Sequence, residues 1–169
     1  MKRYDQNQKD NAMPLPIYTV YLSGPMKGLT PEEAMAWRTN VKVRLPEHIK
    51  CWDPFRGKEL LVKKLNGAGK KLGDEYRDTP ITKAKGITVR DHRDATKCDV
   101  ILINVLGAKF ISIGTVMEAA WAYSAGVPIV LVMETGNPHS HAIFNEVAAY
   151  ITDDITEGIA LVEALLTPQ

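Results

Sequence analysis

The sequence has little of what marks secreted, membrane-bound or nucleic-acid-binding proteins. Its 169 residues include only two cysteines, Cys51 and Cys98, which suggests free thiols in a reducing compartment and leaves one disulfide bridge open. It has no apolar run long enough to span a bilayer. The formal net charge is +1, so the overall charge gives no argument for binding to nucleic acid or to a membrane. We therefore expect a cytoplasmic protein with neither kind of partner.

The N-terminal segment 1–16 is polar and lacks the apolar centre of a secretory signal. We predict that it is a flexible leader ending at Pro14 and Pro16, followed by one domain over residues 17–169. The hydrophobic fraction of 45% is ordinary for a globular protein, and the length is sufficient for one sizeable core. The sequence has no internal repeat and no sign of a second domain.

Strand and helix patterns alternate along the chain. The expected strands are 17–22, 50–53, 99–105 and 128–133. The expected helices are 30–45, 88–97, a stretch that follows a glycine turn at 113–115 and stops at Gly126, 142–150 and 154–166. The first helix is the best marked, because Thr30 and Glu33 form a capping box around Pro31. This alternation predicts a doubly wound α/β fold, Rossmann-like or flavodoxin-like, with helices on both faces of a mostly parallel sheet.

Residues 55–88 interrupt this alternation with a stretch rich in lysine and glycine. Such a polar stretch between regular elements is typical of a mobile surface loop. The alternative is a lid whose positive charges attract a phosphate group over a binding site. The residues leave both interpretations open.

The stretch from Ser112 to Gly126 carries the candidate reactive group. Glu118 lies early in its helix among apolar neighbours, and the helix follows an apolar strand. Open α/β sheets bind ligands at the carboxyl ends of their strands, so this carboxylate is a candidate for the chemistry. The turn with Gly24 and Gly28, after the first strand, can aim backbone N–H groups at an anion. It is neither GxGxxG nor a P-loop, and a plain tight turn is the alternative.

Other polar residues give weaker signals. Asp91 is expected near the start of a short helix, where the helix dipole stabilises a carboxylate whatever its function. His139 and His141 lie two residues apart in a turn-rich segment, with no third ligand spaced to join them. We therefore expect no zinc site.

Three motifs in order resemble the nucleoside 2-deoxyribosyltransferase-like family, which also contains N-glycosidases of nucleoside 5'-monophosphates. They are VYLSGPMKG after the first strand, D-x7-D from Asp91 to Asp99, and S-x-G-T-x-x-E from Ser112 to Glu118. The resemblance covers about residues 17–166. Their order and spacing make the combination more specific than any single motif.

The resemblance implies a mechanism in which Glu118 attacks the anomeric carbon of the sugar and forms a glycosyl-enzyme ester. Tyr21 would orient Glu118 through a hydrogen bond, and Asp91 would hold or protonate the leaving base. The family also implies a homo-oligomer, a dimer at least, and calls for no metal and no organic cofactor. The implied activity is base exchange on a 2'-deoxynucleoside or its 5'-monophosphate. The alternatives are hydrolysis of a nucleoside 5'-monophosphate and a non-catalytic nucleotide-binding module.

The resemblance further implies a set of substrate-binding residues. These are Ser23, Gly24, Pro25, Met26, Lys27, Gly28, Ser112, Gly114, Thr115 and His141. Ser112 stands where many transferases of the family have an aspartate that contacts the base, and a serine looks more like the nucleotide-hydrolysing branch. Lys27 and Gly28 resemble the phosphate-side loop of that branch, and His141 takes the position of a polar residue that a neighbouring subunit contributes.

Overall fold

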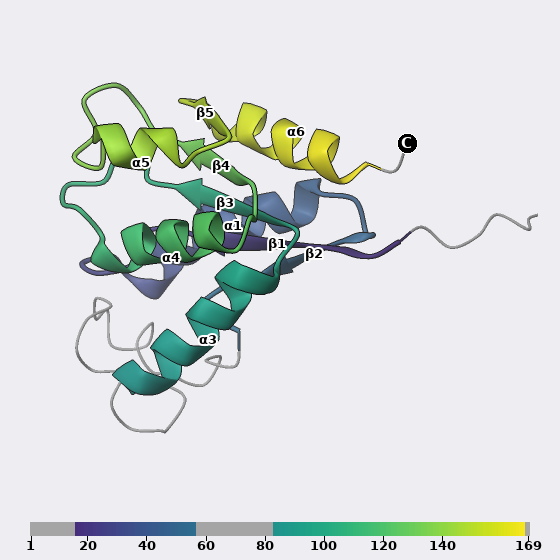
Figure 1. Ribbon diagram of the computed structural model, residues 1–169, viewed down its shortest axis with the longest axis horizontal. Coiled ribbons are helices and arrows are strands. Elements are labelled where there is room, and N and C mark those ends of the chain that lie inside the picture. The colour runs from purple at the N-terminus through teal and green to yellow at the C-terminus, as the bar shows by residue number, and fades with distance from the viewer. Residues whose placement is uncertain (1–15, 57–82, 168–169) are drawn as a thin grey trace, which may run out of the picture.

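The computed structural model describes residues 16–56 and 83–167 (Figure 1). All of the predicted leader except Pro16, and most of the predicted insertion at 55–88, lie outside these residues. The flexible leader and the surface loop or lid at 55–88 therefore stay predictions. Among the residues that are described, no helix is long and apolar enough to cross a membrane.

Five parallel strands form one sheet in the order β2-β1-β3-β4-β5. The strands are β1 (Tyr18–Ser23), β2 (Ile49–Trp52), β3 (Val100–Asn104), β4 (Ile129–Val132) and β5 (Tyr150–Thr152). This strand order is that of flavodoxin-like proteins and confirms the predicted fold class. The chain reverses its direction across the sheet between β1 and β3, and ligands bind at such a switch point in open α/β sheets.

Helices cover both faces of the sheet (Figure 1). They are α1 (Pro31–Arg44), α3 (Ala84–Lys97), α4 (Ile113–Ser124), α5 (Ala142–Glu146) and α6 (Ile155–Leu166). One apolar core joins the sheet to α1 and α6, and a second joins the other face to α3, α4 and α5. The residues of β3 and β4 are all buried, as expected for central strands covered on both sides.

The alternation of side chains in β1 divides that strand between the two cores. Val20 and Leu22 belong to the core of α1 and α6, whereas Tyr21 belongs to the core on the α3 and α4 face. Because residues two apart share a face of a strand, Ser23 points to the same face as Tyr21. The carboxyl end of β1 therefore presents two hydroxyl groups toward α4.

The first helix begins as the capping box predicts. The Glu33 N–H donates to Thr30 Oγ1 at 3.2 Å, and the Thr30 N–H donates to Glu33 Oε2 at 2.8 Å. Pro31 takes the first helical position, where no N–H is needed. This helix packs Val41 and Leu45 against the sheet.

Two sequence-based boundaries differ from the structure around the predicted insertion. Helix α3 begins at Ala84 rather than Thr88, and Lys83 at its N-cap makes no side-chain hydrogen bond. Lacking a capping residue, the first turn gave no sequence signal of a helix start. Asp91 consequently lies in the middle of α3, so the helix dipole does not explain its presence. Phe55, predicted as loop, is buried against Ala34.

The predicted helix 142–150 is also wrong in its second half. Helix α5 ends at Glu146, and Tyr150–Thr152 form the fifth strand, paired with β4. The strand is three residues long and lies at the sheet edge with Tyr150 and Ile151 partly exposed, so it lacks the buried apolar run that marked β3 and β4. Pairing with β4, rather than the local sequence pattern, makes this segment a strand.

Both cysteines are free thiols, as the sequence suggests. Cys51 is half-buried and Cys98 is buried. Burial raises the pKa of Cys51 to about 11 and the pKa of Cys98 to about 12, so both thiols remain protonated near neutral pH.

We expect Gly24→Ala to lower the free energy of unfolding by roughly 2 kcal/mol. A Cβ at this position would lie 2.5 Å from the Asn104 carbonyl oxygen and 3.2 Å from the Trp37 ring, so backbone would have to move. The matched control is Gly114→Ala, because a Cβ there meets no atom within 4 Å. Urea unfolding of both variants measures the difference, and equal stabilities would show that the approach of β1 to β3 tolerates a methyl group.

Candidate active site

Glu118 projects from the buried face of α4 toward the carboxyl end of β1. Its side chain is 8% exposed. The Tyr21 hydroxyl donates to Glu118 Oε1 at 2.9 Å, and the Ser23 hydroxyl donates to Oε2. Each carboxylate oxygen is thus held by one hydroxyl from the same face of β1. The hydrogen bond expected between Tyr21 and Glu118 is present, and Ser23 is a second partner.

Burial and negative neighbours make this carboxyl group hard to ionise. Burial raises the pKa of Glu118 to about 7, and the charge of Asp91 acts in the same direction. The hydrogen bonds from Ser23 and Tyr21 and the charge of Arg38 lower the pKa and offset part of this shift. Glu118 therefore changes charge near neutral pH. Burial and the charge of Glu118 also raise the pKa of Tyr21 well above its usual value, which keeps its phenol protonated and donating.

Helix α3 brings Asp91 to the same region, because α3 and α4 lie side by side (Figure 1). The ring of His92 packs edge-on against Trp121 with centroids 5.1 Å apart, which joins the two helices. Asp91 is buried, and the Arg90 guanidinium donates to its Oδ1 at 2.9 and 3.2 Å. Two carboxylates from facing helices thus share one buried region.

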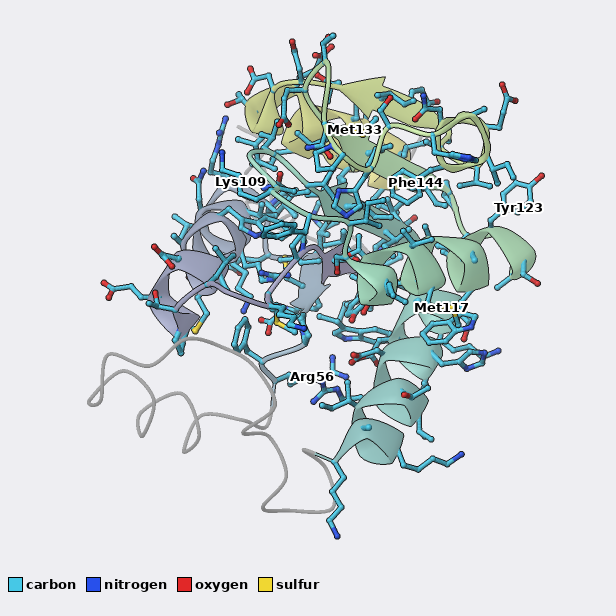
Figure 2. All side chains as sticks on the ribbon, turned by 90° about the vertical axis from the view of Figure 1, so that its left-hand side faces the viewer. Arg56, Lys109, Met117, Tyr123, Met133 and Phe144 are labelled. Carbon is cyan, nitrogen blue, oxygen red and sulfur yellow. The ribbon has the colours of Figure 1, made fainter. Side chains whose placement is uncertain are left out.

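A second buried carboxylate on α3 fixes the segment after β2. Asp94 is fully buried, and Arg56 donates to its two oxygens at 2.7 and 3.0 Å. Figure 2 shows Arg56 beside α3. Arg90 binds the same segment from the helix, donating to the Pro54 carbonyl at 2.8 Å and the Arg56 carbonyl at 3.2 Å. These contacts fix the orientation of α3 and, with it, the position of Asp91.

An open cleft of about 1140 Å³ lies at the switch point between β1 and β3. The turn after β1 forms one wall, the segment 106–114 after β3 forms another, and Glu33 and Trp37 of α1 complete it. Five of the predicted binding residues line this cleft: Pro25, Lys27, Gly28, Ser112 and Gly114. Its size is sufficient for a small molecule such as a nucleotide.

Glu118 is connected to this cleft through both of its neighbouring elements. Ser23, its hydrogen-bond partner, lies two residues before the lining residue Pro25. Gly114 lines the cleft and stands one helical turn before Glu118, so the two positions share a side of α4. A Cβ added to Gly114 would meet no atom within 4 Å. Glu118, Tyr21, Ser23 and Asp91 do not themselves line the cleft, so the carboxylate lies behind its wall.

The other predicted binding residues have different surroundings. Met26 packs in a small cluster with Ala34 and Phe55. Thr115 is 2% exposed and donates its hydroxyl to Ser112 Oγ at 3.0 Å, within the cap of α4. Gly24 approaches the Asn104 carbonyl closely and so has a packing role of its own.

His141 is exposed, and its Nδ1 accepts from the Ile143 N–H at 3.3 Å at the start of α5. It does not line the cleft. Its predicted role in a neighbouring subunit therefore stays a prediction.

His139 supports the start of α4, a role that no pattern in the sequence indicates. Its Nε2 accepts from the Ser112 N–H at 2.8 Å, so in the neutral ring Nδ1 carries the proton and donates to Asn137 Oδ1 at 3.0 Å. Asn137 in turn donates to the Val105 carbonyl at 2.7 Å. Burial lowers the pKa of His139, which favours this neutral form. The network joins the segment after β4 to the cap of α4 and to the end of β3.

No group of three or more histidine, cysteine, aspartate or glutamate side chains that could hold a metal ion occurs among residues 16–56 and 83–167. The two histidines of the turn-rich segment are used differently: His139 is buried in the network above, and His141 caps α5.

The sequence matches no protein-family model. No curated protein matches it either.

Several solved structures resemble this protein in fold, although their sequence identities to it are low. A CMP N-glycosidase from Clostridium botulinum is 17% identical, with a TM-score of 0.51 over 88% of this chain and 99% of its own. A 2-deoxyribosyltransferase from Bacillus psychrosaccharolyticus is 15% identical, with a TM-score of 0.56 over 89% and 98%. The resemblance found in the motifs thus extends to the fold over nearly the whole chain.

The same fold also occurs in a protein described as binding a cofactor. The molybdenum cofactor binding protein of Rippkaea orientalis is 15% identical, with a TM-score of 0.55 over 92% of this chain and all of its own. The fold is therefore shared by deoxyribosyltransferases, nucleotide N-glycosidases and a binding protein, and does not by itself determine activity.

Replacing Glu118 by glutamine removes a group whose ionisation destabilises the folded protein. Its folded pKa of about 7 lies above the unfolded value of 4.5, so its stabilising effect is complete below pH 4.5 and is lost as pH rises through 7. Glu118→Gln has no carboxyl group at this position, so its free energy of unfolding does not fall in this way. The variant should gain about 3 kcal/mol relative to the wild type between pH 4.5 and pH 8. Chemical unfolding of both proteins at several pH values measures the difference in free energy of unfolding. A difference that stays constant with pH would mean that burial does not shift the pKa of Glu118.

Proposed function

We propose that this protein breaks the N-glycosidic bond of a 2'-deoxynucleoside or its 5'-monophosphate and transfers the sugar to a second base. One observation carries the proposal: a buried carboxylate, held by two hydroxyl groups, beside a cleft at the switch point of the sheet. The motifs around Tyr21, Asp91 and Glu118 and the fold shared with known N-glycosidic enzymes give further support.

Glu118 is the nucleophile in this mechanism. A carboxylate oxygen attacks the anomeric carbon and the carbon–nitrogen bond breaks. The base leaves with a proton that comes from solvent and that Asp91, ionised beside Arg90, directs to it. The charge of Glu118 disappears as the ester forms, which relieves the cost of burying it. Attack by a second base or by water on the ester restores the carboxylate and completes a retaining reaction.

Tyr21 and Ser23 orient Glu118 for this attack. Each donates a hydrogen bond to a different oxygen, which leaves a lone pair on either oxygen for the sugar carbon. Their hydrogen bonds also favour the ionised form of Glu118, which the reaction needs. Lys27 and Gly28, which line the cleft, are the candidates for contact with a 5'-phosphate.

Two other functions remain candidates because specific observations favour them. Ser112 in the S-x-G-T-x-x-E motif looks more like nucleotide hydrolases than transferases, and a CMP N-glycosidase shares the fold. In that case water replaces the second base. A non-catalytic nucleotide-binding module is the other candidate, supported by the cofactor-binding protein of the same fold.

Product analysis distinguishes these functions. Purified protein is incubated with deoxynucleosides and deoxynucleoside 5'-monophosphates, with and without a free acceptor base, and the products are separated by chromatography. A new nucleoside that needs the acceptor is the expected result. Free base from monophosphates alone would indicate hydrolysis, and a bound nucleotide recovered unchanged would indicate a binding module.

Glu118→Ala and Glu118→Gln should each lower the cleavage rate at least roughly 1,000-fold while the protein stays folded by circular dichroism. The wild-type rate should rise with pH through about 7, because only the ionised carboxylate attacks. Near-wild-type turnover in either variant would exclude Glu118 as the nucleophile.

We also propose that the protein is a homo-oligomer. Helix α4 buries one apolar side and exposes another, formed by Ile113, Val116, Met117 and Tyr123. Figure 2 shows Tyr123 projecting away from the molecule at the end of α4. A helix that is apolar on both sides is typical of a buried helix, and extended exposed apolar surface marks an interface.

We expect Tyr123→Glu to weaken self-association at least roughly tenfold, because a charge would be buried in the interface. Sedimentation equilibrium over a range of concentrations measures the change. Val43→Glu is the matched control, since Val43 is an apolar residue of α1 that is 80% exposed. A wild-type protein that is monomeric at high concentration would contradict the oligomer outright.

A further inference from the structure

Arg38 of α1 is buried in a way that needs an explanation. It is 1% exposed, and no carboxylate forms an ion pair with it among the described residues. Burial lowers the pKa of its guanidinium only to about 10, so it stays positively charged at neutral pH. Burying an arginine that lacks such an ion pair is costly unless its hydrogen bonds are satisfied. Within the described part of the chain, the side-chain hydrogen bonds of Arg38 all go to backbone carbonyl groups.

The guanidinium binds the end of β1 where that strand extends past β2. Nε donates to the Leu22 carbonyl at 3.2 Å, Nη2 donates to the Gly24 carbonyl at 3.0 Å, and Nη1 donates to the Ala34 carbonyl. The last pair between β1 and β2 is Tyr21 with Trp52, so the carbonyl groups of Leu22 and Gly24 face the side where β2 has already ended. The planar fork of an arginine matches two such carbonyl groups at once.

Ser23 lies between the two carbonyl groups that Arg38 binds. Its peptide neighbours are held from the α1 side, while its hydroxyl donates to Glu118 on the α4 side. Fixing both flanking residues fixes the direction in which the Ser23 side chain leaves the backbone. Gly24 permits this, because a Cβ there would lie 3.5 Å from Arg38 Nη2 and 2.5 Å from the Asn104 carbonyl oxygen.

The guanidinium is itself held in place by two rings. Its central carbon lies 4.4 Å from the centroid of Trp37 and 5.8 Å from that of Phe55. Trp37 also lines the cleft, so Arg38 is positioned directly behind the wall that a ligand would contact.

We propose that Arg38 is a positioning residue for Glu118, acting through the backbone on either side of Ser23 and through its positive charge. The inference rests on the proposed function, in which Glu118 must be ionised and correctly directed. Arg38 differs from the residues that touch the carboxylate, because it lies on the opposite side of β1.

The charges around Glu118 come from three elements and act in opposite directions. Burial and Asp91 of α3 raise the pKa of Glu118, whereas Ser23 and Tyr21 of β1 and Arg38 of α1 lower it. Arg38 is the one positive charge among these contributions. Without Arg38, the lowering effect of its positive charge on the pKa of Glu118 is lost, while the raising effect of Asp91 remains.

The test separates the two actions of Arg38 with two variants. Arg38→Met removes the charge and the hydrogen bonds, whereas Arg38→Lys keeps the charge but cannot bind both carbonyl groups with one nitrogen. The titration of the Glu118 carboxyl carbon is followed by 13C NMR and assigned by its absence in Glu118→Gln. Turnover is measured on the same samples with the substrate identified by product analysis.

We expect Arg38→Met to move the Glu118 titration upward by at least half a pH unit and to lower kcat at least tenfold. Arg38→Lys should leave the titration midpoint nearly unchanged and still lower kcat, because Ser23 is no longer fixed. Arg44→Met is the matched control on the exposed side of α1, and neither quantity should change in it. Within residues 16–56 and 83–167, the one side-chain hydrogen bond of Arg44 goes to Thr156 at 3.1 Å.

An unchanged titration midpoint and unchanged kcat in a folded Arg38→Met would overturn the inference. If Arg38→Met does not fold, Arg38→Lys carries the test, and wild-type turnover in that variant would overturn it. The titration needs no catalysis, so it still tests the position of Arg38 if no N-glycosidic activity is found. A failure of the proposed function and a failure of this inference are thus distinguishable.

Discussion

The burial of the Glu118 carboxylate is the constraint on which the rest of the site depends. Glu118 lies on the inner side of α4, where ionisation is costly because water is excluded. Tyr21 and Ser23 compensate from the same face of β1, each with one hydroxyl. Two residues at alternate positions of a strand can do this only if the strand end and the helix are held in fixed register. Much of the surrounding structure can be understood as support for that register.

The support comes from both sides of the sheet. On one side, Arg38 binds the free carbonyl groups at the end of β1, and Gly24 allows β1 to approach β3 closely. On the other side, the neutral ring of His139 accepts from Ser112 and holds the first turn of α4. Arg38 holds β1 through backbone carbonyl groups, and His139 holds α4 through the backbone N–H of Ser112. These contacts position the two elements that carry Ser23 and Glu118.

The carboxylates of α3 add a second constraint. Asp91 and Asp94 are both buried near Tyr21, and arginine side chains bind each of them. Their negative charge raises the pKa values of Tyr21 and, through Asp91, of Glu118. A site arranged in this way keeps a phenol protonated and a carboxyl group near its midpoint at neutral pH. Such perturbed groups beside a cleft are typical of catalytic sites and also occur in ion-pair networks that serve stability alone.

The amino-acid sequence by itself determined the alternation of elements, the capped start of α1 and the two central strands, because these depend on local periodicity and capping. It also determined the reactive candidates, Tyr21, Asp91 and Glu118, through motif order. Only the tertiary structure decided that β5 is a strand and that Asp91 lies in mid-helix. It alone revealed Arg38 as a support, since an arginine within a helix looks like any exposed one. These features depend on contacts between residues far apart in the chain, so no short stretch of sequence can predict them.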